Sequence, residues 1–113
     1  MNNPTQQEDY GMSVEQAQLI IGEGAKVDRL MQNKDFQDII MDGFIKQSAL
    51  NKVSLLAVPD MAEHRDNIMK ELDAISILDA FLRNIQNTSN QTKQSLAEFE
   101  EEQRQEQELE EDA

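Results

Sequence analysis

The stretch that decides the fold is 61–86, which reads MAEHRDNIMKELDAISILDAFLRNIQ. An apolar residue recurs there at every seventh position, in the series Met61, Ile68, Ile75 and Leu82. Other apolar residues fill or widen this seam: Leu72, Leu78, Ile85, Ile77 and Phe81. Such a period is typical of an α-helix that packs lengthwise against other helices. We therefore predict a helix from Asp60, whose side chain can cap it, to about Gln86.

The seven-residue seam has two interpretations. In the first, it packs inside the chain against the preceding helices and forms the core. In the second, it is a coiled-coil-like surface through which the chain docks on a partner or associates with a second copy of itself. The sequence leaves both open, because the same period serves an internal core and an intermolecular seam.

A second helix is predicted over 33–57. Its first apolar set has the spacing of one helix face and comprises Phe36, Ile39, Ile40, Gly43 and Phe44. A second apolar row lies beside it and comprises Ile45, Ala49, Leu50, Val53, Leu55 and Leu56. A helix with two apolar faces packs between neighbours, and Gly43 would let one neighbour approach closely. The helix should end near Ala57, because Pro59 disfavours a helical conformation for Val58.

A first helix is predicted to begin at Ser13, which has Gln16 three residues on as a capping-box partner. Gly22 and Gly24 interrupt its apolar pattern. Glycine is unfavourable inside a helix, so this pair indicates a bend or a close approach of another backbone. Asn33 can either end this helix or cap the next one.

The charge of the chain is concentrated at its C-terminal end. The 113 residues carry a net charge of −13, and 98–113 holds nine acidic residues against Arg104 alone. The preceding segment, 87–97, is rich in Asn, Gln, Ser and Thr. We predict an all-α fold: a small three-helix bundle over 13–86, a flexible polar arm at 1–12, a polar linker at 87–97 and an acidic tail at 98–113. Because its like charges repel, the tail should be a fraying helix or disordered.

Composition excludes or disfavours several classes of protein. The chain has no cysteine, which excludes disulfides and thiolate chemistry. No secretory signal and no membrane-length apolar run is visible. The excess of carboxylates disfavours direct binding to nucleic acid or to an anionic membrane.

No residue pattern indicates catalysis or metal binding. His64 is the single histidine, and Asp60 lies one helical turn before it. A zinc site needs three or four ligands, so an exposed helix residue is the better interpretation of His64. Carboxylate pairs such as Glu71 with Asp79 are expected to be solvated. We predict a non-enzyme with no cofactor and no metal.

Several runs resemble a pattern found in small acidic proteins of tailed-bacteriophage genomes. The matching runs are Val27-Asp28-Arg29-Leu30, Asn33-Lys34-Asp35-Phe36, Gly43-Phe44 and Phe81-Leu82-Arg83-Asn84-Ile85. The resemblance spans 14–112 and includes the Glu-rich end, although Phe44 stands where a tyrosine is expected. It implies a virion or virion-assembly protein, found in the virion or the host cytoplasm, whose partners are other virion proteins. It supplies no catalytic residue.

Two functions follow as hypotheses. The first is a helical module that docks on a larger virion component. Its candidate partner-binding residues are Phe36, Ile40, Phe44, Met61, Ile68, Ile75, Leu82, Glu100, Glu101 and Glu102. The second is an acidic inhibitor that mimics DNA and blocks a nucleic-acid-binding protein of the host. Mimicry requires carboxylates spaced like phosphates over a rigid surface, whereas most of the excess charge here lies in one terminal run.

Overall fold

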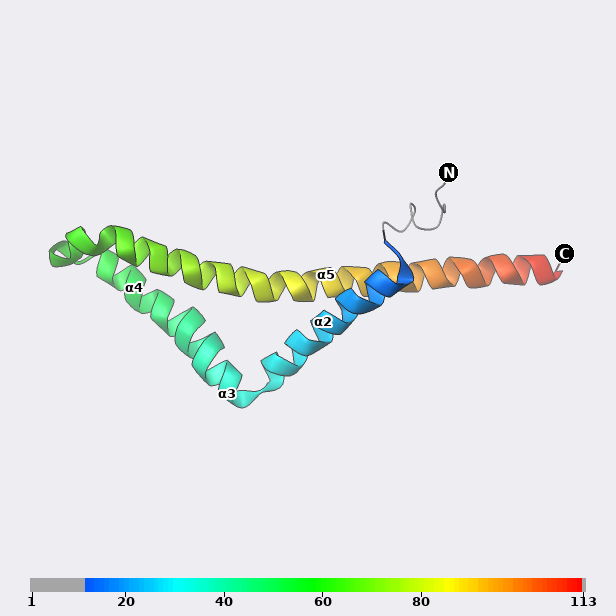
Figure 1. Cartoon of the computed structure of the whole chain (residues 1–113), viewed down its shortest axis with the longest axis horizontal. Helices are drawn as coiled ribbons and strands as arrows, with labels where there is room; N and C mark the ends of the chain where they lie inside the picture. The colour runs from blue at the N-terminus through cyan, green and yellow to red at the C-terminus, as the bar shows by residue number, and fades with distance from the viewer. Residues whose placement is uncertain (1–11, 113) are drawn as a thin grey trace. The chain divides into compact units, whose positions relative to one another are not determined.

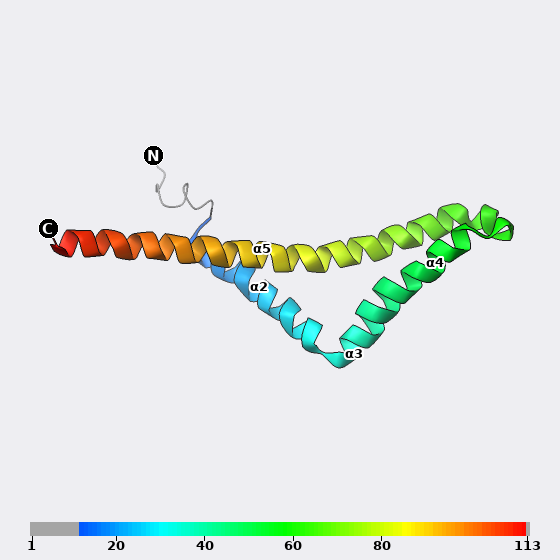
Figure 2. The same ribbon diagram turned by 180° about the vertical axis from the view of Figure 1, so that it is seen from behind.

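The computed structural model describes residues 12–112, so the predicted arm lies outside the described residues except for Met12. The described chain is helical apart from short turns and contains no strand, which confirms the all-α class. Its elements in chain order are α2 (Val14–Gln32), α3 (Lys34–Phe36), the π-helix η1 (Gln37–Ser48), α4 (Ala49–Leu56), the 3-10 helix η2 (Pro59–His64) and α5 (Arg65–Asp112) (Figure 1). Figure 2 shows the same elements from behind.

The chain divides into two compact units. The central unit is Lys26–Asn84. The terminal unit combines the residues up to Ala25 with those from Ile85 onward. Each division falls inside a helix, the first within α2 and the second within α5.

The start of α2 is the predicted capping box. The Ser13 amide donates to Oε1 of Gln16 at 3.0 Å, and the Gln16 amide donates to Oγ of Ser13 at 3.1 Å. These two bonds satisfy amides that the first turn of a helix leaves without partners. The helix then continues through both glycines to Gln32.

Close packing in the terminal unit depends on Gly24 and Ser89. Ser89 is 1% exposed, and a Cβ added at Gly24 would overlap with the Cβ and Oγ of Ser89. Nothing lies within 4 Å of a Cβ added at Gly22, so only the second glycine serves a close approach. Ala17 and Thr92 are the other buried side chains of this unit.

Residues 87–97, predicted from composition to be a polar linker, belong to helix α5 in the structure. The helix continues through this segment because the seven-residue packing series of α5 continues into it. Ser89 falls seven residues after Leu82, at the next position of the apolar series, and its small side chain fits opposite Gly24. Serine and threonine therefore serve here as small packing residues, not as breakers of the helix.

Asn33 performs both of the roles proposed for it in the central unit. Its amide donates to the Leu30 carbonyl at 3.0 Å, which closes the last turn of α2. Its side-chain oxygen accepts from the Phe36 amide at 2.9 Å and caps the next helix. One residue thus joins two helices without a longer loop.

Helix α4 ends just before Pro59, as predicted. The following helix does not start at Asp60, where it was predicted to start. Helix α4 ends at Leu56, and Val58 is extended with φ −89° and ψ 118°, as expected before Pro59. Val58, not Asp60, is the N-cap, and it precedes the 3-10 helix η2. Pro59 stands at the first position of η2, where its missing amide costs no hydrogen bond, and α5 begins at Arg65.

The helical stretch between Asn33 and Ala57 differs from the prediction in its winding. Residues Gln37–Ser48 form a π-helix, whose i→i+5 hydrogen bonds place more than four residues in each turn. The half-buried apolar residues accordingly fall four to five positions apart, at Phe36, at the adjacent pair Ile40 and Met41, at Ile45 and at Ala49. Ile39 is 68% exposed and Phe44 is 37% exposed, so the predicted single face is divided.

Two further expectations for this stretch are not met. A Cβ added at Gly43 would meet only the carbonyl oxygen of Asp38, in its own helix, so no neighbouring helix approaches there. The second apolar row is also largely outside the core, because Leu50 and Val53 are more than half exposed. The half-buried side of α4 includes Lys52, whose ammonium lies 3.1 Å from the Glu71 carboxylate on α5.

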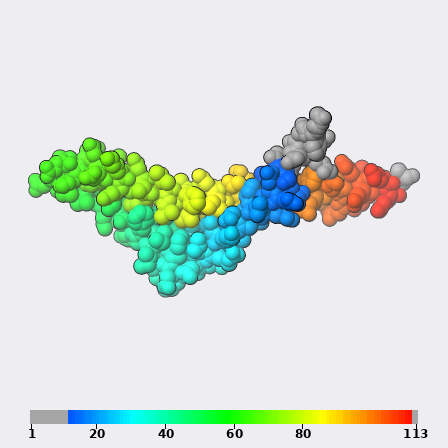
Figure 3. Space-filling view, viewed as in Figure 1, coloured from blue at the N-terminus to red at the C-terminus, as the bar shows by residue number. Residues whose placement is uncertain are grey.

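The core of the central unit consists of Val27 from α2 and Ile68, Ile75 and Leu82 from α5. All four side chains are at most 6% exposed. Figures 1 and 2 both show α4 converging on the first turns of α5 at the turn that η2 forms, and Figure 3 draws the same region as a space-filling surface. The Lys52–Glu71 ion pair joins the same two helices.

We predict that Gly24→Ala lowers the free energy of unfolding by about 1–3 kcal/mol relative to Gly22→Ala. Both changes gain the same helix propensity, but only the first forces a methyl group into the Ser89 side chain. Urea unfolding followed by far-UV circular dichroism measures the difference. Ser89→Gly should restore part of the loss, and equal stability of the two alanine variants would contradict the close approach.

We predict that Ser89→Ala stabilises the protein by about 1 kcal/mol more than Ser76→Ala does. The Ser89 hydroxyl is buried without a hydrogen-bond partner among the described residues, whereas Ser76 is an exposed serine of the same helix. Both changes gain helix propensity, so the difference isolates the cost of burying the hydroxyl. Thermal unfolding of the two variants provides the measurement, and a destabilised Ser89→Ala would reveal a hydrogen bond.

Candidate interaction surface

The seam residues of α5 lie in the interior of the central unit. Ile68, Ile75 and Leu82 are buried, and Met61 is half-buried in η2. This burial agrees with the first interpretation of the seam, internal packing. These side chains are consequently not accessible to a partner in the folded chain.

The accessible apolar side chains lie elsewhere in the central unit. Of the thirteen large apolar residues that are exposed among residues 12–112, ten belong to this unit. We call these ten the outer apolar surface: Leu30, Ile39, Phe44, Leu50, Val53, Leu55, Val58, Met69, Ile77 and Phe81. The three others are Val14, Leu19 and Leu109.

Ile77 and Phe81 are the most exposed apolar pair on α5. They are 68% and 59% exposed, and they are four residues apart, so their side chains are neighbours on the helix surface. Ile77 follows the buried Ile75 by two residues, which is a rotation of about 200° around the helix. The pair therefore lies on the side opposite the core and does not widen the seam.

The other helices of the central unit add to the outer apolar surface. Leu50 and Val53 are 56% and 54% exposed and lie three residues apart on α4, so they form a second neighbouring pair. Ile39 and Phe44 lie on η1, and neither occupies its half-buried side. Of the residues proposed from sequence for this helix, Phe36 and Ile40 are half-buried, and Phe44 is the one at the surface.

Charge is divided unequally between the two units. The central unit has ten acidic and eight basic residues, for a net charge of −2. The described part of the terminal unit has eleven acidic and two basic residues, for a net charge of −9. The outer apolar surface therefore belongs to a nearly neutral unit.

The acidic segment is the last part of helix α5. Glu100, Glu101 and Glu102 are exposed, as are all residues from Arg104 to Glu111. Phe99 and Gln103 are half-buried, so the segment leaves the packed part of its unit after Gln103. The guanidinium of Arg104 pairs with the Glu101 carboxylate one turn earlier.

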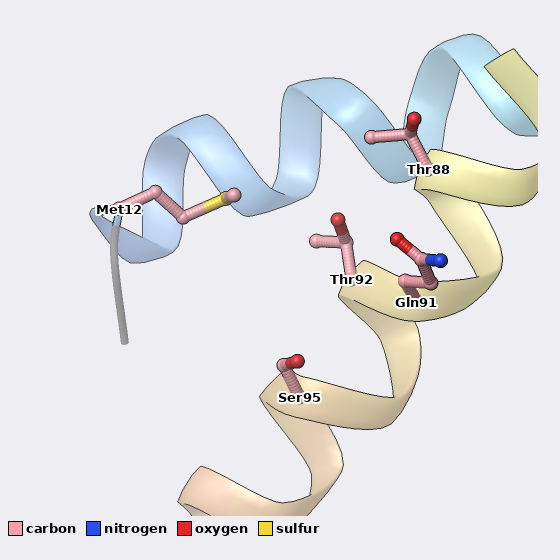
Figure 4. Close-up of a pocket in the computed structure, with 5 residues that line it drawn as sticks. All are labelled: Met12, Thr88, Gln91, Thr92 and Ser95. Carbon is pink, nitrogen blue, oxygen red and sulfur yellow. The ribbon is translucent and has the colours of Figure 1, made fainter. Parts of the chain in front are cut away.

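The terminal unit has one shallow pocket near the start of α2. Figure 4 shows the Met12 side chain facing α5, where four polar residues line the pocket: Thr88, Gln91, Thr92 and Ser95. Its volume is about 180 Å³, smaller than the roughly 300–1,000 Å³ of typical small-molecule sites. Among the described residues, the lining contains no carboxylate, histidine or lysine.

His64 lies in η2 and is half exposed, with Nε2 at 3.5 Å from the Glu63 carboxylate. Within residues 12–112 no three His, Asp or Glu side chains are arranged to hold a metal ion. None of the described helices is both long enough and apolar enough to cross a membrane.

We predict that Ile77→Gln and Phe81→Gln each change the free energy of unfolding by less than about 0.5 kcal/mol, because both side chains are already in water. Ile75→Ala, in the same helix, should cost about 2–5 kcal/mol because it leaves a cavity. Urea unfolding distinguishes the two classes. A loss at Ile77 or Phe81 as large as that at Ile75 would show that these residues belong to the core.

Glu100, Glu101 and Glu102 are exposed, but they belong to the terminal unit and not to the outer apolar surface. Ile77 and Phe81 lie near the centre of the seam in the sequence, and the rotation from Ile75 separates them from it in the helix. Comparison of the chain with protein-family models, with curated proteins and with solved structures finds no match.

Proposed function

We propose that this protein is a virion structural or assembly protein of a tailed bacteriophage, a non-enzymatic helical module that docks on a larger virion component. The phage origin is supported by the resemblance of the runs from Val27 to Phe36 and from Phe81 to Ile85. The docking role is supported by one observation. Within residues 12–112 only five apolar side chains are buried, whereas thirteen large ones are exposed.

This imbalance matters because apolar burial is the main force that stabilises a small domain. Four of the five are valine, isoleucine or leucine in the central unit, and each contributes about 1.5–3 kcal/mol, which offsets little of the entropy lost on folding. A partner that covers the outer apolar surface would supply the missing burial. In this proposal the three helical stretches, 14–32, 34–56 and 65–112, complete their small bundle on the partner.

The surface fits a protein partner with an apolar, helical or flat face. Pairs such as Ile77 with Phe81, and Leu50 with Val53, are spaced to fill grooves between side chains of a facing helix. The net charge of −13 disfavours a second copy of the chain and also disfavours nucleic acid or an anionic membrane as direct partners. The acidic end of α5 would keep the unassembled protein soluble or contact a basic patch on the same partner.

We predict that tagged protein recovered from infected cells carries capsid, portal or tail proteins, identified by mass spectrometry. The double variant Ile77→Gln/Phe81→Gln should lose most of this material, because it removes the exposed pair without charge change. Leu19→Gln is the matched control, since Leu19 is 72% exposed but lies in the terminal unit. Recovery of further copies of this chain alone would assign the surface to self-association.

The second candidate is the DNA mimic, and the helical state of the acidic segment favours it in one respect. Helix α5 continues through Asp112, so the carboxylates from Glu98 onward have fixed spacings. Deletion of 98–113 separates the two functions. A mimic would lose its host polymerase or nuclease, whereas a virion module would keep its partner through the outer apolar surface.

A further inference from the structure

The first part of helix α2, residues 14–21, is held in the terminal unit by little packing, and we call this segment the strap. Ala17 is the one buried side chain within it. Ile20 and Ile21 are half-buried, and Leu19 is 72% exposed. Burial of an alanine removes much less apolar surface from water than burial of the valine, isoleucine and leucine side chains that form the core of the central unit.

The side of α5 that the strap faces adds little to this packing. The shallow pocket of about 180 Å³ lies where the start of α2 meets α5 (Figure 4). Its α5 side consists of uncharged polar side chains, among them Thr88, Thr92 and Ser95. Closing the strap over such residues buries little apolar surface, so the contact contributes little stability.

Gly22 follows the strap directly and has no packing role. Nothing lies within 4 Å of a Cβ added there, whereas Gly24 has no room for a Cβ because Ser89 lies against it. Glycine weakens a helix at an interior position, because its unfolded backbone has more conformational freedom to lose. The fold gives no reason for a glycine at position 22, and its effect is to weaken α2 at that point.

The rest of α2 is fixed on the far side of Gly22. Gly24 packs against Ser89, and Val27 is 4% exposed in the core of the central unit. These contacts hold the helix from Gly24 onward when the strap is released. The strap alone is too short to be a stable helix in water, so it unwinds when it leaves α5.

We propose that the strap opens from α5 by a break of the helix at Gly22 while the rest of the fold stays intact. This opening is a local equilibrium, distinct from unfolding of the whole chain. It uncovers the side of α5 that carries Thr88, Thr92 and Ser95. Under the proposed function, the strap is then the segment that a helix of the partner displaces most readily, although the opening itself depends on no partner.

Hydrogen exchange followed by NMR on the full nitrogen-15-labelled chain tests this proposal. Amides 18–21 bond to carbonyls inside the strap, whereas amides 28–31 lie in the fixed part of the same helix. In the wild type we expect protection to be about tenfold lower, or lower still, at 18–21 than at 28–31, with a step at Gly22. Low concentrations of urea should leave exchange at 18–21 nearly unchanged, because a local opening exposes little surface.

Gly22→Ala should slow exchange at 18–21 about fivefold and leave 28–31 unchanged, because alanine strengthens the helix where it breaks. Ser76→Ala is the matched control. It also puts alanine at an exposed helical position, but in α5, so it should not alter exchange at 18–21. Two outcomes would overturn the proposal. One is protection that does not change in a step at Gly22. The other is that both variants slow exchange at 18–21 and at 28–31 alike, which would show that the strap opens only when the whole chain unfolds.

Discussion

The seven-residue spacing of Ile68, Ile75, Leu82 and Ser89 along α5 is the constraint on which the packing of both units depends. The first three positions hold large apolar side chains and form most of the core of the central unit. The fourth holds a serine because the backbone of Gly24 lies where a larger side chain would project. Within one helix, the size of the residue at each seventh position thus sets how closely the next helix approaches. A leucine at position 89 would keep the seam apolar, but it could not occupy the space beside Gly24.

The features that the sequence predicts correctly are those with local causes. The Ser13–Gln16 capping box, the two roles of Asn33 and the helix end before Pro59 each depend on residues a few positions apart. The helical state of 87–97 has a distant cause, the approach of Gly24, and composition alone suggested a linker. The π winding of η1 could not be predicted from the sequence either. Apolar spacing is compared with the 3.6-residue period of an α-helix, so a helix with a different number of residues per turn is not recognised.

The outer apolar surface likewise depends on distant contacts that the sequence pattern does not reveal. Apolar spacing identifies residues that can pack on one side of a helix. It does not show whether that side packs against the same chain or against another molecule. Ile68, Ile75 and Leu82 therefore appeared as docking candidates and are buried. Ile77 and Phe81 are exposed, as a rotation of about 200° from Ile75 around the helix would predict. The exposure of Glu100, Glu101 and Glu102 can be predicted from the sequence alone, because a run of like charges is rarely buried.

The chain combines an exposed apolar surface on a nearly neutral unit with a strongly acidic second unit, and the two have opposite effects on association between copies. Ten large apolar side chains exposed to water favour association between copies of the chain. The central unit, at −2, does little to oppose it, whereas the terminal unit carries −9 in its described part. Repulsion between exposed charges is screened over roughly 8–10 Å at physiological ionic strength. The excess charge therefore opposes close contact between two terminal units, and it does not by itself protect the outer apolar surface, which belongs to the other unit. Under the proposed function, that surface is protected only when a partner covers it.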